Sequence, residues 1–464
     1  MRPVKAAVSG CVLAVALALT GTVPVAAAAD PGGHFTGTLP DGTTWIADVP
    51  ASWNGILLLY SHAFGTLTAA DAPDPTTQSA LLARGYALAG SSYDPNGSLW
   101  ALDTAVSDQF GTLRAVEASV LPGRPRQVLA FGTSMGGLVS ALEAQDGAGL
   151  IEGALTTCGI VGGGINLNEY QLFGEYALAQ LLLPGQQVQL VGFANAGDAL
   201  ATAATLQAAA VQAQQTAAGR ARLALALAFL NTPTWDPSQT APAPADDPAA
   251  QEAAQYDVEF FPSAFSTLDF IESARPSVDQ ADGGSANWTA GVNFAAVLAR
   301  SPYLPEVAAL YHTAGLSLGA DLDTLRRHAD ITADPAAAAS LARTSVPTGH
   351  LAVPELDLHT IGDQLVAVQQ ENFYAGQVRA AGDGNLLRQA FVASYGHCNF
   401  SSAELVAGVL AISHRVATGH WGSVASVASL NQVASGLNLG PARFTDFYPG
   451  PLTGATSVYP FWLG

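Results

Sequence analysis

A short glycine-rich turn between a predicted strand and a predicted helix constrains this chain more than any other feature. The turn reads G-T-S-M-G-G at residues 132–137, after an apolar run at residues 128–131 and before helix-forming residues at 138–144. Its glycines permit a strained turn and let the helix approach the strand closely. Such a turn lifts the hydroxyl of Ser134 above the sheet, so Ser134 is a candidate nucleophile. The alternative is a Gly/Ser-rich loop without chemistry.

Strand and helix predictions alternate on both sides of this turn. Residues 35–39 and 43–49 flank a P-D-G turn and are predicted to form a β-hairpin. Residues 56–60 form a continuous apolar run, typical of a strand buried on both faces. The alternation predicts a doubly wound, mostly parallel α/β sheet with right-handed crossovers. The other predicted strands are 86–91, 128–131, 153–157, 353–359 and 390–394, and the predicted helices are 77–84, 102–119, 367–381 and 403–418, followed by an irregular tail.

This alternation stops between residues 165 and 345. The stretch is rich in Ala, Gln and Leu, and it has helical runs at 199–215 and 220–230 and a Pro-rich segment after them. We predict a large helical cap inserted between strands, because strand patterns resume after it; a separate helical domain is the alternative. The core sheet would then be built from two parts of the chain, residues 30–164 and 346–464.

The first 29 residues have the pattern of a secretory signal peptide. Arg2 and Lys5 precede an apolar run at residues 8–19, and A-A-A precedes Asp30 as a cleavage site. The apolar run is too short to span a membrane. We therefore expect a secreted protein, with residues 1–29 removed and no stable membrane association.

The composition is that of an acidic globular protein. The chain has 17 Lys and Arg residues against 37 Asp and Glu residues, a net charge of −20 at pH 7, which repels nucleic acid. The sequence has no H-E-x-x-H, C-x-x-C or phosphate-binding glycine motif, so neither a metal site nor a cofactor is expected. Cys158 and Cys398 are the two cysteines outside the leader, and such a pair in an exported protein is predicted to form a disulfide.

A serine hydroxyl becomes a nucleophile when a base accepts its proton and an acid orients that base. The C-terminal ends of parallel strands bring such groups to one edge of a sheet. Asp363 lies four residues after His359, the predicted end of one strand, and His397 lies three residues after the predicted end of the next. We therefore expect His397 as the base and Asp363 as the acid for Ser134. Asp357 lies within its strand and is expected to be packed or paired there.

The chain resembles the α/β-hydrolase superfamily from the first hairpin to the helix predicted at 403–418, outside the cap. Four motifs carry the resemblance: S-H-A-F-G at 61–65, the turn at 132–137, G-D-Q-L-V at 362–366 and G-H at 396–397. Their order of Ser, Asp and His is that of the superfamily. The resemblance implies an α/β-hydrolase fold, with Ser134 as nucleophile, His397 as base and Asp363 as the acid that orients it.

The same resemblance implies an oxyanion hole made of backbone N–H groups. One donor would be Met135, and the other would follow His62, at Phe64 or Ala63. Many members have glycine where this chain has Ala63, so both assignments of the second donor stay open. His62 itself is expected to shape this loop. The remaining histidines are expected at surface or structural positions: His34, His312, His328, His350, His359, His414 and His420.

Cys158 ends the strand after the Ser134 turn, and Cys398 directly follows the predicted base. A bond between them would tie the His397 loop to the sheet beside Ser134. The arrangement is similar to the tannase and feruloyl esterase group, in which a disulfide joins the neighbours of Ser and His. In that group the cysteine immediately precedes the serine, whereas Thr133 holds that place here.

These residues predict a secreted serine hydrolase that cleaves a carboxylic ester through an acyl-enzyme intermediate. An amidase or exopeptidase would use the same three residues, so that alternative stays open. The expected partner is a small ester or amide substrate. A third interpretation is a non-catalytic α/β-hydrolase homologue that binds a ligand or another protein.

Overall fold

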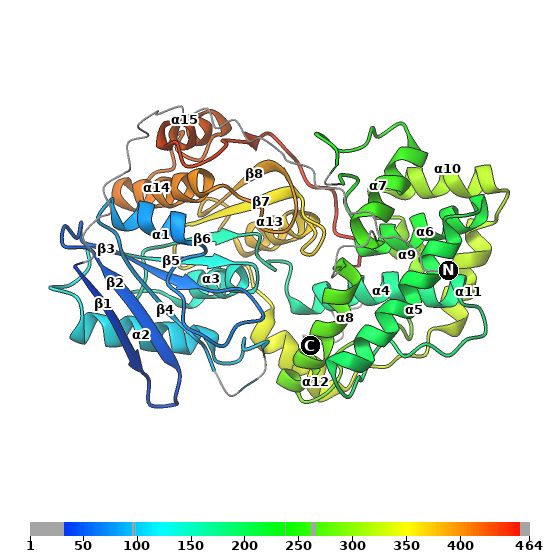
Figure 1. The fold of residues 1–464 in the computed structure, drawn as a ribbon, viewed down its shortest axis with the longest axis horizontal. Coiled ribbons are helices and arrows are strands. Elements are labelled where there is room, and N and C mark those ends of the chain that lie inside the picture. The colour runs from blue at the N-terminus through cyan, green and yellow to red at the C-terminus, as the bar shows by residue number, and fades with distance from the viewer. Residues whose placement is uncertain (1–31, 95–96, 98, 237, 261–265, 455–464) are drawn as a thin grey trace, which may run out of the picture.

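The computed structural model describes residues 32–94, 97, 99–236, 238–260 and 266–454. The predicted signal peptide at residues 1–29 lies outside the described residues. Figure 1 shows a sheet covered by helices at one end of the molecule and a group of helices at the other. Within the described part of the chain, every helix is too short or too polar to cross a membrane.

The described residues form a nine-stranded sheet in the order β1-β2-β4-β3-β5-β6-β7-β8-β9. Strands β3 to β8 run parallel, β2 pairs antiparallel with β1 and β4, and β9 pairs antiparallel with β8. The predicted hairpin and the predicted mostly parallel sheet are therefore confirmed. The strands are β1 (Gly33–Thr38), β2 (Thr44–Val49), β3 (Ile56–Ser61), β4 (Ala87–Ser91), β5 (Gln127–Thr133), β6 (Gly153–Thr157), β7 (Glu355–Gly362), β8 (Leu387–Tyr395) and β9 (Phe444–Thr445).

Helices cover both faces of this sheet. They are α1 (Pro75–Leu82), α2 (Ala105–Ser119), α3 (Met135–Asp146), α13 (Gln369–Ala381), α14 (Ser402–Thr418) and α15 (Val427–Leu437). Along β3, Leu57 and Leu59 belong to the core beneath α2, α3 and α13, whereas Leu58 and Tyr60 belong to the core beneath α1, α14 and α15. Because successive side chains of a strand point to opposite faces, this double burial explains the unbroken apolar run in the sequence.

The chain between β6 and β7 forms a second group of helices, termed the cap. Within the described residues they are α4 (Gly164–Leu182), α5 (Ala196–Ala213), α6 (Ala217–Leu230), α7 (Pro248–Phe260), α8 (Thr267–Asp282), α9 (Phe294–Leu298), α10 (Leu304–Ala314), α11 (Leu318–His328) and α12 (Pro335–Ser345). The ring of Phe294 contacts Phe173, Tyr176 and Phe229 at the centre of this group. The same apolar cluster includes Met135 of α3, so the cap and the sheet share a core at the predicted turn.

The end of the chain differs from the predicted irregular tail after residue 418. Helix α15 follows Ser426, whose side chain caps the first turn, and it buries Leu430 and Ala434 in the core beneath α14. Strand β9 then pairs with β8 at the edge of the sheet. The prediction of an irregular tail was wrong because this helix is short, and packing rather than a long sequence repeat stabilises it.

Candidate active site

Ser134 lies in a strained turn between β5 and α3, with φ 60° and ψ −121°. A Cβ on Gly132 would lie 1.8 Å from the carbonyl oxygen of Gly136, and a Cβ on Gly136 would lie 1.9 Å from the carbonyl oxygen of Ser61. These two positions therefore cannot carry a side chain. Because none is present, strand β5, helix α3 and the loop after β3 can pack closely against one another. The predicted sequence of strand, sharp turn and helix is confirmed.

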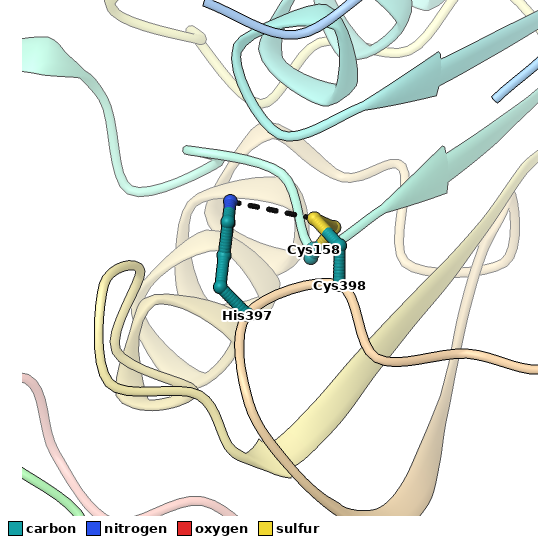
Figure 2. Close-up of side chains that lie close together, drawn as sticks. All are labelled: Cys158, His397 and Cys398. Carbon is teal, nitrogen blue, oxygen red and sulfur yellow. Dashed lines mark hydrogen bonds between the residues drawn. A yellow bond between two sulfur atoms is a disulfide. The ribbon is translucent and has the colours of Figure 1, made fainter. Parts of the chain in front are cut away.

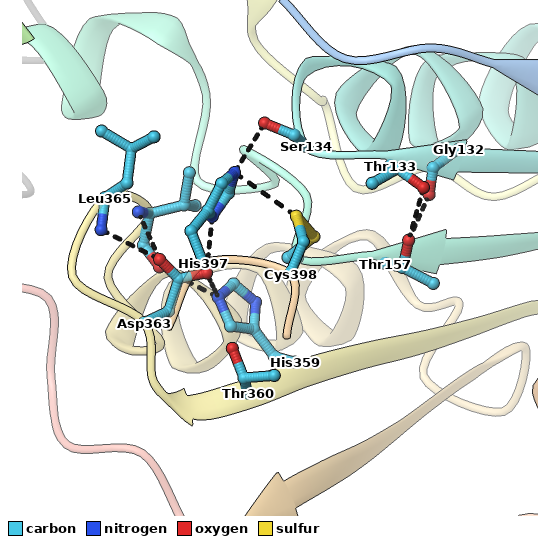
Figure 3. Close-up of a disulfide and its surroundings, with 12 residues drawn as sticks. Gly132, Thr133, Ser134, Thr157, His359, Thr360, Asp363, Leu365, His397 and Cys398 are labelled. Atoms are coloured by element: carbon cyan, nitrogen blue, oxygen red, sulfur yellow. Dashed lines mark hydrogen bonds and ion pairs between the residues drawn. A yellow bond between two sulfur atoms is a disulfide. The ribbon is translucent and has the colours of Figure 1, made fainter. Parts of the chain in front are cut away.

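The structure brings Ser134, His397 and Asp363 together in one chain of hydrogen bonds (Figure 3). The Oγ of Ser134 lies 2.8 Å from Nε2 of His397, and Nδ1 of His397 lies 2.7 Å from Oδ2 of Asp363. With its proton on Nδ1, His397 donates to Asp363 and accepts from the serine hydroxyl through Nε2. Asp363 directly follows β7 and His397 follows β8, so the ends of neighbouring strands supply both side chains.

The carboxylate of Asp363 is held from two sides. Its Oδ1 accepts hydrogen bonds of 2.9 Å from the backbone N–H groups of Leu365 and Val366. Its Oδ2 faces His397 and, at 3.4 Å, Nε2 of His359. Burial opposes ionisation, but the charges and hydrogen bonds of the two histidines outweigh it and hold the pKa of Asp363 well below its ordinary value. Asp363 is therefore ionised and fixed in orientation.

His359 is a neighbour of this site that the sequence reasoning missed. It is fully buried, with Nδ1 2.7 Å from Oε1 of Glu371 and Nε2 2.9 Å from the carbonyl oxygen of Val366. Burial lowers its pKa, but hydrogen bonds to Asp363 and Glu371 overcome this effect and raise the pKa to about 10. His359 is thus a buried imidazolium behind Asp363. The sequence feature that could have identified His359 is its position four residues before Asp363, at the end of the same strand.

Cys158 and Cys398 form the predicted disulfide, with their Cα atoms 5.3 Å apart (Figure 2). The Sγ of Cys398 lies 3.3 Å from Nε2 of His397. Both cysteines have positive φ angles, 43° and 53°, in a region that residues other than glycine rarely adopt. The bond joins the end of β6 to the loop that carries His397. Because both sulfur atoms are used in the disulfide, this cluster of sulfur and imidazole groups does not offer thiolates to a metal.

The loop after β3 passes over the start of α3. Nδ1 of His62 donates to the carbonyl oxygen of Ala63 at 2.8 Å, and the imidazole contacts the ring of Tyr93 at a tilt of 30°, with ring centroids 4.1 Å apart. Burial lowers the pKa of His62, so this imidazole is neutral. Phe64 lines the same pocket as Ser134. The backbone N–H groups of Met135, Phe64 and Ala63 remain predictions for the oxyanion hole.

A narrow pocket of about 50 Å³ opens beside Ser134. Loops of the sheet contribute Phe64 and Trp100, and helix α8 of the cap contributes Phe270. The polar side chains in its lining, besides Ser134, come from the cap: Asn168, Gln171 and Arg275. Sequence reasoning missed these three, because a polar residue on a cap helix gives no sign that it faces a pocket.

The strand order, the turn after β5 and the meeting of Ser134, His397 and Asp363 at one edge of the sheet define the α/β-hydrolase fold. The chain therefore has the α/β-hydrolase fold that its resemblance to that superfamily implied.

Comparisons with known proteins give the following similarities. No family model matches the chain. It is 28% identical over 438 residues to the o-phthalyl amidase of Xanthobacter agilis, covering 88% of this chain and 92% of that protein. The structure of feruloyl esterase B from Aspergillus oryzae aligns with 83% of this chain and 80% of its own, at 11% identity and a TM-score of 0.43. That of a bacterial brefeldin A esterase aligns with 91% and 80%, at 12% identity and a TM-score of 0.35.

Proposed function

We propose that this α/β-hydrolase is a serine hydrolase that cleaves a carboxylic ester through an acyl-enzyme intermediate. The observation that carries the proposal is the hydrogen-bond chain from Ser134 through His397 to the ionised Asp363. A serine in this setting has a base within hydrogen-bond reach, and the acid beside that base fixes its tautomer.

In the proposed reaction, Ser134 Oγ attacks the acyl carbon while Nε2 of His397 takes its proton. Asp363 stays ionised and stabilises the imidazolium that forms. The oxyanion is expected to rest on the N–H of Met135 and on that of Phe64 or Ala63. His397 then gives its proton to the leaving oxygen, and it later activates the water that releases the acid from Ser134.

An amide is the second candidate substrate. It is favoured by the similarity of this chain to an amidase, to which it is 28% identical. An amine leaves only after protonation, so this reaction depends more strongly on proton donation by His397. Turnover of matched ester and amide pairs with the same acyl group separates the two candidates, and an exopeptidase would in addition require a free peptide terminus.

The experiment that tests the proposal is labelling with a fluorophosphonate, which reacts with activated serines. The protein should label and should hydrolyse at least one simple ester, whereas Ser134→Ala should do neither. Loss of Ser134 is expected to lower kcat on the order of 10⁴- to 10⁶-fold. A folded protein that neither labels nor turns over any ester or amide would favour the non-catalytic interpretation.

We also propose that the protein is exported, because residues 1–29 have a charged start, an apolar run and a small-residue cleavage site. Expression of the full chain in a bacterial host should place the protein outside the cytoplasm with its N-terminus near Asp30. Retention of the leader on cytoplasmic protein would contradict this proposal.

A further inference from the structure

A second space in the structure is a groove of about 530 Å³ at the edge of the sheet. Helix α13, strand β8, the start of α15 and the chain after β9 line it. Among the described residues, its lining shares no member with the pocket beside Ser134. Sites for small molecules have volumes of roughly 300–1,000 Å³. This edge groove is therefore large enough to be a separate ligand site.

The edge groove exists because the last strand of the sheet is short. Strand β9 has two residues, which pair with Phe391 and Val392 of β8. Within the described part of the chain, residues 387–390 have no partner strand on that side. The chain that follows β9, residues 446–449, forms one wall of the groove instead of extending the pairing.

One end of the edge groove is cationic. Arg379 in the last turn of α13 and Arg388 of β8 belong to its lining, and both side chains are exposed. Both also lie beside Gly384, since Nη1 of Arg388 is 3.5 Å from its carbonyl oxygen and a Cβ on Gly384 would lie 3.3 Å from Cγ of Arg379. Asp446 is the one acidic residue among the described residues of the lining. In a chain of net charge −20, two neighbouring arginines form a local positive site that attracts an anion.

The other end of the edge groove is aromatic. The chain turns between α13 and β8 at the arginine end, and β8 rises about 3.3 Å per residue, so Phe391 lies about 10 Å along the strand from Arg388. The ring of Phe391 contacts Phe447, with ring centroids 5.5 Å apart. The next residue, Tyr448, also lines the groove and is 91% exposed. These rings offer apolar surface to a ligand held at the cationic end.

We propose that the edge groove is a second binding site, which takes a carboxylic acid with an apolar body. Its carboxylate binds at Arg379 and Arg388, and its body lies towards Phe447 and Tyr448. A guanidinium is planar and its paired N–H groups match the two oxygens of a carboxylate. This site is distinct from the acyl pocket, and its binding step does not depend on the proposed hydrolase function.

Gln389 connects the edge groove to the catalytic residues. It lines the groove, and its Nε2 donates to Oε2 of Glu371 at 2.5 Å and to the backbone carbonyl oxygen of Glu371 at 3.0 Å. Glu371 in turn holds His359, which lies behind Asp363. A ligand that excludes water from Gln389 should strengthen these hydrogen bonds, because hydrogen bonds are stronger where the local dielectric is low. We therefore expect binding to raise kcat, and this part of the inference rests on the proposed function.

The binding test titrates octanoate into the full chain by calorimetry, with uncharged octanamide as the comparison. Octanoate should bind at least tenfold more tightly than octanamide, and high salt should weaken its binding because exposed charges are screened. Arg379→Met/Arg388→Met should lower the affinity at least tenfold, and Tyr448→Ser should lower it as well. Arg326→Met/Arg327→Met is the matched control, because it removes two exposed arginines that pair with Asp323 in the cap, and it should bind as wild type does.

The kinetic test measures turnover of a simple ester with and without octanoate. Saturating octanoate should raise kcat of wild type at least twofold, and Arg379→Met/Arg388→Met should not respond at the same concentration. An acid that only competes at Ser134 would raise KM and leave kcat unchanged, so the two sites give different results.

Octanoate binding that is absent, or equal in wild type and Arg379→Met/Arg388→Met, would overturn the proposed site. Binding without a rise in kcat would overturn its connection to the catalytic residues. A protein that binds octanoate but turns over no ester or amide would instead contradict the proposed hydrolase function and leave the binding site intact.

Discussion

His359 Nε2 lies 3.4 Å from Asp363 Oδ2, the same carboxylate oxygen that accepts from His397. Two imidazoles therefore share one carboxylate, one facing Ser134 and the other fully buried behind it (Figure 3). Glu371 holds the far side of His359 at 2.7 Å. The orientation of His397 thus depends on a network of four side chains rather than on Asp363 alone.

We expect His359→Gln to lower kcat roughly 10- to 100-fold, the range found when the outer partner of a functional side chain is removed. The amide cannot carry the charge that stabilises the Asp363 carboxylate, so His397 is oriented less well. KM should change little, because His359 does not line the pocket. The measurement is kcat and KM for one ester, with fluorophosphonate labelling in parallel.

His350→Gln is the matched control, since His350 is exposed and pairs with Asp383 away from the site. Wild-type kcat in a folded His359→Gln variant would show that the second imidazole does not position the site. A rise in KM without a fall in kcat would also contradict a positioning role.

The disulfide should stabilise both the fold and the His397 loop. We expect Cys158→Ser/Cys398→Ser to lose about 2–5 kcal/mol of stability and to lower kcat, because the bond closes a separation of 240 residues beside the base. Thermal melts with and without reductant check this expectation. Wild type should melt lower in reductant, and the double variant should not respond. Identical melting of oxidised and reduced wild type would argue against a stabilising bond.

We expect that Gly136 cannot be replaced by a larger residue, because no space is available for a side chain at this position. In Gly136→Ala the new Cβ would lie 1.9 Å from the carbonyl oxygen of Ser61, so the loop after β3 or helix α3 must shift. We expect a loss of about 3 kcal/mol or more in stability, or insoluble protein. Gly436→Ala in α15 is the control, because its Cβ meets nothing within 4 Å and should be neutral or slightly stabilising. Equal melting temperatures for the two variants would refute this account.

The sequence alone predicted the parts of the fold and of the site that depend on local sequence patterns. The turn at Ser134 has glycines at fixed spacing, and Asp363 and His397 each follow a strand, so order and context predicted their meeting. His359 and Glu371 could not be paired in advance, because their contact depends on how β7 packs against α13. Arg275 lies on a cap helix whose packing no local pattern specifies.

We expect the stability of the protein to depend on pH, in part because of Glu143 of α3. Its side chain is fully buried, and neither carboxyl oxygen has a hydrogen-bond partner among the described residues. Burial raises its pKa well above the ordinary value, and it raises those of Glu259 and Glu306 to about 8 and about 9. Above about pH 4.5 the unfolded state releases the protons of these carboxyl groups, whereas the folded state keeps them. The folded state therefore becomes less stable as pH rises from about 4.5 towards these pKa values.

His359 acts in the same direction, because its stabilising charge is fully present below about pH 6.5 and is lost as pH rises through about 10. The depressed pKa of Asp363 acts in the opposite direction, but only below its ordinary value of 3.8. Since each pKa unit corresponds to about 1.4 kcal/mol, the protein should melt at least about 5 °C higher at pH 5 than at pH 8.5. In Glu143→Gln, which cannot ionise, this difference should narrow. A wild-type protein that melts higher at pH 8.5 would show that these buried carboxyl groups do not control its stability.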